Sequence, residues 1–120
     1  MGPVLLSTAC QPIASEDASN ALDKINFDLN ELDDNGLYGP PDGLRSLDYE
    51  FCIPEGEVYA QAVKAIDPSL NFYPHSRGRI GCTDGQVLAI GNTHQPNAQD
   101  ILLELANLDY IERIEPVVWE

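Results

Sequence analysis

The chain is poor in basic residues. Lys and Arg together number 6 against 20 Asp and Glu, which gives a formal net charge of -14 at pH 7. Nucleic acids and anionic membrane surfaces carry the same sign of charge and repel such a protein. The composition therefore argues against nucleic-acid binding and favours a protein partner with a basic surface.

The sequence also lacks a long apolar run. A membrane-spanning helix needs ~20 consecutive apolar residues, and no stretch of this sequence approaches that length. Attachment to a membrane is therefore expected only through an anchor. Hydrophobic residues still make up 43% of the 120 residues, which is enough for a folded core. We expect one domain with an N-terminal extension.

Cys10 follows a short apolar run, Val4 to Ala9, and precedes the polar sequence Gln11-Pro12. This arrangement resembles the cleavage and lipidation site of a bacterial lipoprotein signal. The resemblance implies export to the periplasmic side of the cell envelope or to a lumen, with lipid attached at Cys10. The alternative is a hydrophobic N-terminus that carries an unmodified cysteine.

The composition changes twice along the chain. Residues 1–16 read as a signal remnant and tether, residues 17–43 as an N-terminal helix followed by a Gly/Pro linker, and residues 44–120 as the domain. The helix is predicted from apolar residues at helical spacing, with Ser15 as its N-cap. These apolar residues are Ala18, Leu22, Ile25, Leu29 and Leu32. The turn sequence Gly39 to Gly43 ends this segment.

From Leu44 onward, strand and helix patterns alternate. The predicted elements are a strand over 47–53, a helix over 58–66, extended segments over 70–81 and 86–92, a helix over 97–108 and a strand over 111–118. This order predicts an α+β, ferredoxin-like βαββαβ sandwich with strand order 4-1-3-2. Pro74 and Pro116 then fall in the two edge strands, where a missing backbone donor is tolerated.

One face of this sheet is expected to pack on the two helices. Residue parity assigns Asp48, Glu50 and Cys52 to the other face, together with Arg77 and Arg79. The small residues of the third strand would lie between them. These are Val87, Ala89 and Gly91. We expect the N-terminal helix to cover this face; the alternative is that its apolar residues bind a partner.

Cys52 and Cys82 form an even pair once Cys10 carries lipid, and a disulfide is expected in an oxidising compartment. The third predicted strand separates them, so the turn that carries Cys82 must fold over the sheet for the bridge to close. A free thiol pair is one alternative. A catalytic cysteine with His75 or His94 as its base is another.

His75, Arg77 and Arg79 concentrate basic character in an otherwise acidic sequence. Guanidinium groups present paired donors to planar anions, so this segment is a candidate site for an anion or an acidic group of a partner. The simpler interpretation is internal pairing with Asp48 and Glu50, or solvation.

A partial calcium-loop pattern precedes the domain. Glu31, Asp33, Asn35, Gly36 and Asp42 occupy positions 1, 3, 5, 6 and 12 of such a loop. The pattern resembles an EF-hand, but Pro40-Pro41 excludes the usual exit helix. Acidic turn chemistry explains the same residues without a metal. A zinc site from His75, Cys82 and His94 lacks the usual short ligand spacings, and no cofactor is expected.

From Phe27 to Trp119 the chain resembles small uncharacterised cyanobacterial-type lipoproteins, through the segments GPPDGLRSLDYEFCIP and GRIGC. That resemblance implies an envelope or lumenal location and no particular activity. The C-terminal segment, Leu105 to Pro116, resembles the last helix and strand of subtilisin-propeptide-type inhibitors. That resemblance implies a sheet pressed against a protease, with Val118 and Trp119 entering its active site.

These patterns together predict a non-catalytic accessory or protein-interaction module that is exported and lipid-anchored. Binding is expected at an edge strand or at the open face of the sheet. The alternative is a propeptide-type inhibitor of a subtilisin-like protease. The sequence offers no catalytic constellation, and we do not expect an enzyme.

Overall fold

Alternating apolar and polar residues build the two central strands. The computed structural model describes residues 20–117. In it, β1 spans Asp48–Pro54 and β3 spans Gln86–Asn92. The two strands are antiparallel, with Phe51 opposite Ala89 and Cys52 opposite Leu88. Both strands lie where the alternation predicted them.

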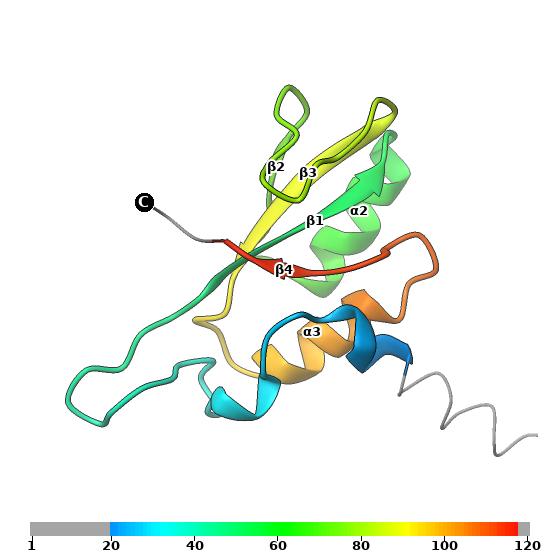
Figure 1. Cartoon of the computed structure of the whole chain (residues 1–120). Coiled ribbons are helices and arrows are strands. Elements are labelled where there is room, and N and C mark those ends of the chain that lie inside the picture. Colours follow the sequence, from blue (N-terminus) through cyan, green and yellow to red (C-terminus); the bar gives the residue numbers. More distant parts are fainter. Residues whose placement is uncertain (1–19, 118–120) are drawn as a thin grey trace, which may run out of the picture.

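Four strands form one antiparallel sheet in the order β2-β3-β1-β4 (Figure 1). The edge strands are β2 (Asn71–Tyr73) and β4 (Glu115–Pro116). Helix α2 (Glu57–Ile66) lies between β1 and β2 in the chain, and α3 (Ala98–Ala106) between β3 and β4. The α+β class is confirmed, and the strand order is the predicted one.

Both edge strands are shorter than predicted. The second extended segment was expected to reach Gly81, but β2 ends at Tyr73 because Pro74 has no backbone N–H for the ladder. The last strand was expected from Ile111, but the backbone N–H of Ile114 donates to the oxygen of Lys24 at 2.8 Å instead. Proline and an alternative backbone partner therefore limit the two edges.

Residues 74–85, called the flap from here on, connect β2 to β3. Figure 1 shows this segment crossing in front of the sheet, with α2 behind it. A turn ends the flap, in which the N–H of Gln86 donates to the oxygen of Thr83 at 3.0 Å and Gly85 has φ 87. The Asp84-Gly85 pair favours a tight hairpin between two strands. The turn does form, but it joins β3 to the flap rather than to a strand.

The two helices pack on one face of the sheet, and α2 does so through different residues than expected. In α2, Val63 is fully buried and Tyr59 and Ile66 are partly buried, whereas Val58 is 68% exposed. The apolar spacing predicts a buried face of Val58, Ala62, Ala65 and Ile66. Ile66 does pack against the core, but the other three residues are exposed, so most of that predicted face is wrong. Tyr59 turns inward instead because its ring packs edge-on against Tyr110, with centroids 5.0 Å apart.

The apolar spacing predicts a helix face of Ile101, Leu102, Leu105 and Leu108. Leu102 and Leu105 of α3 are buried and the other two are partly buried, which confirms this face. Asn97 occupies the N-cap position, but its side chain makes no capping hydrogen bond. Its backbone is left-handed, with φ 62, and its N–H donates to the oxygen of Asp34 at 3.3 Å. Asn is a favoured N-cap residue and Asn97 is expected to cap this helix through its side chain, but that expectation is wrong.

The continuous N-terminal helix to Leu32 is also wrong. Residues 20–24 are helical, and a separate 3-10 turn, η2, spans Leu29–Glu31. Between them Ile25 forms a parallel bridge with Ile114, and Asp28 caps the 3-10 turn through the N–H of Asn30. Backbone pairing with a neighbouring segment and local Asp capping replace the helical hydrogen bonds here. Ser15 and Ala18 lie outside the described residues.

Ile25, Leu29 and Leu32 are buried, but they do not cover the open sheet face. They belong to the same core as Tyr49 and Phe51, on the side of the helices. The expected covering of the opposite face by this segment is therefore wrong. The described part of residues 17–43 shares its core with the domain that follows.

The register of β1 and β3 decides which side chains share a face. Tyr49, Phe51 and Ile53 lie on the helix side and are at most 1% exposed. Glu50 and Cys52 lie on the opposite side, and their cross-strand partners are Ile90 and Leu88. Directly opposed residues lie on the same face. The prediction that Val87, Ala89 and Gly91 share a face with Cys52 is therefore wrong, because it shifted β3 by one residue.

No helix within residues 20–117 combines the length and apolar character that crossing a membrane requires.

Candidate functional site

The flap is fastened to the sheet by a covalent bond. Cys52 and Cys82 form a disulfide with 5.6 Å between the two Cα atoms. The predicted bridge is confirmed, and so is the expectation that the segment carrying Cys82 folds over the sheet. Ile80, Cys82 and Leu88 form a small apolar cluster there, together with Cys52 and Ile90. This cluster is separate from the main core.

The flap also covers a carboxylate. Glu50 is only 2% exposed, and the backbone N–H groups of Ile80 and Arg79 donate hydrogen bonds to it. Burial raises the pKa of the Glu50 carboxyl, while these two N–H groups and the charge of Arg79 partly offset the increase. The flap backbone thus supplies the polar partners that a buried carboxylate requires.

The structure separates the three basic residues of the predicted anion site. His75 and Arg77 line one shallow pocket of about 290 Å³. Arg77 donates to Asp84 at 2.8 Å and to the backbone oxygen of Cys82 at 3.2 Å. Arg79 instead acts on Glu50. Arg77 and Asp84 are both exposed, so their ion pair contributes little to stability. Internal pairing therefore holds for Arg79 with Glu50, whereas Arg77 pairs with Asp84 rather than with either expected acid.

The partial calcium loop folds as an acidic turn. Asp33 accepts hydrogen bonds from the backbone N–H groups of Asn35 and Leu37 at 2.8 and 3.0 Å. The bond from Leu37, followed by that from Asn35, lowers the pKa of the Asp33 carboxyl. Within residues 20–117 no cluster of three or more His, Cys, Asp or Glu is arranged to hold a metal ion. Glu31 and Asp42, like Asp33, are exposed.

A buried polar network lies at the end of α2, and the sequence patterns missed it. Asp67 is 0% exposed, and its carboxyl accepts hydrogen bonds from the Tyr49 hydroxyl, from the hydroxyl and N–H of Ser69, and from the Gln95 amide. Burial, and then the charge of Asp67, raises the pKa of Tyr49. The sequence signal was Asp-Pro-Ser, which predicts only a helix end.

This network joins α2, β1 and the segment after β3. Within residues 20–117 every buried side-chain nitrogen and oxygen has a hydrogen-bond partner. The network therefore contains no unsatisfied polar atom that points to a ligand, and its contacts explain it as a tie between elements.

An apolar groove runs between α2 and the edge strand β2. Its volume is about 620 Å³. It is lined by Glu57, Ala60, Gln61, Lys64, Ala65, Leu70, Asn71 and Phe72. The alanines of α2 leave the space, and Leu70 and Phe72 supply apolar surface from the side of the sheet. The sequence shows the alanines, but it does not show that they lie beside the sheet edge.

One acid and one base line this groove, Glu57 and Lys64. Lys64 donates through its ammonium group to the backbone oxygens of Pro68 and Leu70, at 2.9 and 2.7 Å. The ammonium group of Lys64 is therefore already engaged by backbone oxygens of the same chain. Glu57 is exposed at the first position of α2 and also lines the groove. The groove thus offers a carboxylate to an incoming chain.

The two edges of the sheet differ. Beside β4, the bridge of Ile25 to Ile114 places the N-terminal segment along the edge, and the N–H of Asn26 donates to the oxygen of Ile114 at 3.0 Å. At the other edge, no strand within residues 20–117 pairs with the outer side of β2. An open strand edge is a template for an added strand.

Three of the predicted functional residues lie outside the described residues: Cys10, Val118 and Trp119. Comparisons with known proteins found no matching protein-family model, no similar curated protein and no similar solved structure.

Proposed function

We propose that this chain is a non-catalytic protein-interaction module that binds an extended segment of a partner along the outer edge of β2. The observation that carries the proposal is the open edge strand beside an apolar groove. A strand added there pairs its backbone with β2 and directs every second side chain towards α2. The groove between α2 and β2 supplies the space for those side chains.

The partner segment is expected to be basic as well as apolar. The whole chain carries a formal charge of -14, and Glu57 lies exposed in the groove. A second copy of this chain would bring the same excess of negative charge, which opposes self-association through this edge. A segment that alternates apolar residues with Lys or Arg matches both the apolar lining of the groove and the negative charge of the protein.

The domain is proposed to be a ferredoxin-like sandwich, which the strand order and the two helices support. Export and lipid attachment at Cys10 are part of the same proposal, supported by the sequence around that residue. Expression with the native upstream sequence in the presence of a labelled fatty acid tests the anchor. The wild type should incorporate label, and Cys10→Ser should not; equal labelling of both would exclude Cys10 as the attachment site.

We do not propose the protease-inhibitor alternative. An inhibitor of the propeptide type presses its sheet against the protease, whereas the flap lies over that face here, held by the disulfide.

The binding test uses the full chain and a displayed library of random ten-residue peptides. Enriched peptides should alternate apolar residues with Lys or Arg. In spectra of isotope-labelled protein, they should shift the amide signals of β2 and of Leu70. Enrichment of acidic peptides, or shifts confined to other surfaces, would contradict the proposal, as would a library that yields no binder.

A matched pair of substitutions on α2 locates the site. Ala65→Trp fills the groove and should weaken binding of the selected peptides by about tenfold or more, because their side chains lose that space. Ala62→Trp adds the same side chain to an exposed position that does not line the groove, and it should leave the Kd unchanged. Equal effects from the two variants would remove the groove from the proposal.

A further inference from the structure

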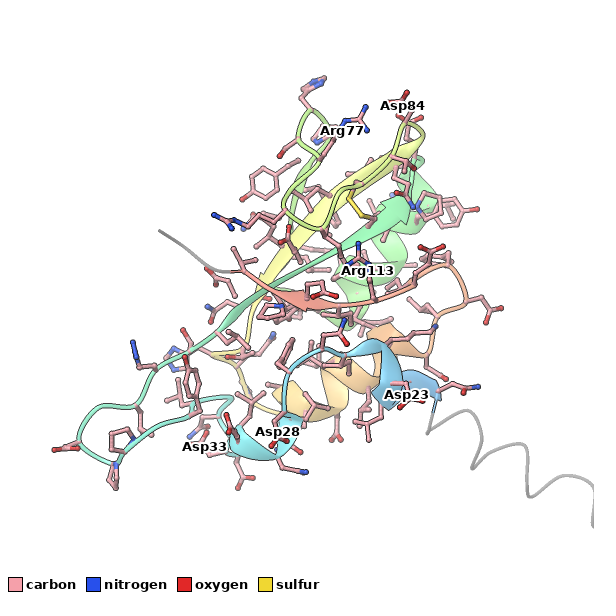
Figure 2. The ribbon with its side chains drawn as sticks, viewed as in Figure 1. Asp23, Asp28, Asp33, Arg77, Asp84 and Arg113 are labelled. Atoms are coloured by element: carbon pink, nitrogen blue, oxygen red, sulfur yellow. A yellow bond between two sulfur atoms is a disulfide. The ribbon has the colours of Figure 1, made fainter. Side chains whose placement is uncertain are left out.

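A small pocket beside the flap is lined in part by Cys52, one of the two cysteines of the disulfide. The pocket has a volume of about 170 Å³, and Cys52, Gly81, Thr83 and Arg113 are among its lining residues. Cys52 is partly exposed, whereas Cys82 is 1% exposed. Figure 2 shows the disulfide as a yellow bond where the flap crosses the sheet, near the labelled Arg113. Cys82 lines the neighbouring pocket of His75 and Arg77, but of the two cysteines only Cys52 keeps partial exposure.

The wall of the pocket carries charges of both signs, Arg113 and Glu112. Arg113 donates to the backbone oxygen of Ile80 at 2.7 Å and to Glu115 at 3.2 Å, and its side chain remains 49% exposed. A thiolate, not a thiol, is the nucleophile that attacks a disulfide. Glu112 and Glu115 offset the charge of Arg113, so the partial exposure of Cys52, rather than the charge of the pocket, is what admits such an anion.

We propose that the Cys52–Cys82 bridge is a thiol–disulfide exchange site at which a dithiol reductant attacks Sγ of Cys52 and releases the flap. The reductant's thiolate forms a new bond to Sγ of Cys52 as the bond to Cys82 breaks. Cys82 leaves as a thiolate and takes up a proton. The second thiolate of the reductant then attacks the reductant's own sulfur in the mixed disulfide, and Cys52 departs in its turn. The protein gains two electrons and two protons, and the dithiol becomes a disulfide.

Release of the flap need not unfold the domain. The apolar contacts of the flap belong to a cluster that is separate from the main core. Its three left-handed glycines, Gly78, Gly81 and Gly85, give the flap backbone little conformational restraint of its own. Opening exposes Leu88, Ile90 and Glu50 on the sheet, a surface absent from the oxidised form. This inference is independent of binding at β2.

The first experiment identifies the attacked sulfur. The oxidised full chain, carrying Cys10→Ser to remove the third thiol, is mixed with glutathione and quenched within seconds by excess N-ethylmaleimide. Peptide mass spectrometry should find glutathione on Cys52 and maleimide on Cys82. The opposite labelling, or an even distribution between the two cysteines, would overturn the proposal.

The second experiment tests the pocket. Thr83→Trp fills the entrance and should slow reduction by dithiothreitol by about tenfold or more. Asp42→Trp places the same ring in the distant exposed hairpin and should react at the wild-type rate. A reduction rate that instead rises with urea in proportion to the globally unfolded fraction would show that exchange requires unfolding, and would sink the proposal.

The third experiment follows the flap itself. After reduction, backbone amides of residues 74–85 should lose protection from hydrogen exchange, while those of β1 and α3 keep it. Uniform loss of protection, or unchanged protection in the flap, would show that the bridge does not control this segment separately.

Discussion

The two faces of the sheet are stabilised by different kinds of interaction. On the helix side, Phe51 and Tyr49 are fully buried in one apolar core that also contains α2, α3 and the N-terminal segment. On the other side, only a small cluster lies under the flap, and a disulfide fastens it. The same strands thus contribute to the main apolar core on one face. On the other face, a disulfide holds the flap over a small apolar cluster.

The largest effect is expected from truncating the core on the helix side. Phe51→Ala should lower the free energy of unfolding by about 3 to 5 kcal/mol, because it removes a 0% exposed ring and leaves a cavity. Urea unfolding of the oxidised protein measures this loss. Leu44→Ala, at a residue 46% exposed, is the control and should change stability by less than about 0.5 kcal/mol. Similar losses from both variants would contradict the assignment of the core.

On the flap side, removal of the bridge should have a comparable but local effect. The double variant Cys52→Ser, Cys82→Ser loses a crosslink across a sequence separation of 30, which the chain-entropy estimate values at roughly 3 to 4 kcal/mol. Circular dichroism should still show a folded sheet and helices, because the main core is intact. A variant that is wholly unfolded would show that the two faces are not independent.

Two glycines allow a closer comparison of the faces. A Cβ at Gly91 would lie 2.8 Å from the ring of Tyr49, which is fully buried, so Gly91→Ala should destabilise the whole domain by about 1 to 3 kcal/mol. Gly78→Ala, with φ 67 and Leu88 at 2.8 Å, should mainly loosen the flap. Hydrogen exchange separates the two outcomes. Local loosening by Gly91→Ala, or global loss by Gly78→Ala, would reverse the comparison.

The smallest effect is expected in the dependence of stability on pH, through the Glu50 carboxyl under the flap. The pKa of Glu50 is raised in the folded protein, chiefly by burial. The native state therefore holds its proton to higher pH than the unfolded state, and the resulting contribution to stability is complete below the ordinary pKa of 4.5. It is lost as pH rises through the higher folded pKa.

Glu50→Gln removes this titration, so the free energy of unfolding of the variant should change less with pH across that range. Unfolding midpoints between pH 4 and pH 7 measure it, and the exposed Glu57→Gln serves as the matched control. Identical pH profiles for wild type and Glu50→Gln would show that the carboxylate is not held as the structure describes.

Local patterns were sufficient for the central elements of this fold. The alternation around Phe51 located β1, the Asp-Gly turn preceded β3, and Asp67-Pro68 ended α2 where expected. The order of the elements predicted the strand order. The even number of cysteines that remain once Cys10 carries lipid predicted the disulfide. These features depend on residues close in sequence, or on few topological choices, so the sequence could specify them.

Features that depend on distant partners were not predictable in the same way. Ile25 leaves its helical pattern because the backbone of Ile114, remote in the sequence, offers hydrogen bonds. Tyr59, rather than Val58, turns inward because Tyr110 lies opposite it. The groove beside β2 was missed for the same reason, since Ala65 becomes part of a site only once Leu70 and Phe72 lie beside it.

The sequence by itself determined the acidic character of this protein, its α+β class and the pairing of Cys52 with Cys82. Only the tertiary structure decided which residues share a face, which edge of the sheet stays unpaired among residues 20–117 and which cysteine of the bridge stays partly exposed. Composition and periodicity are properties of single segments. Register, edge pairing and access arise only when segments far apart in the chain pack together.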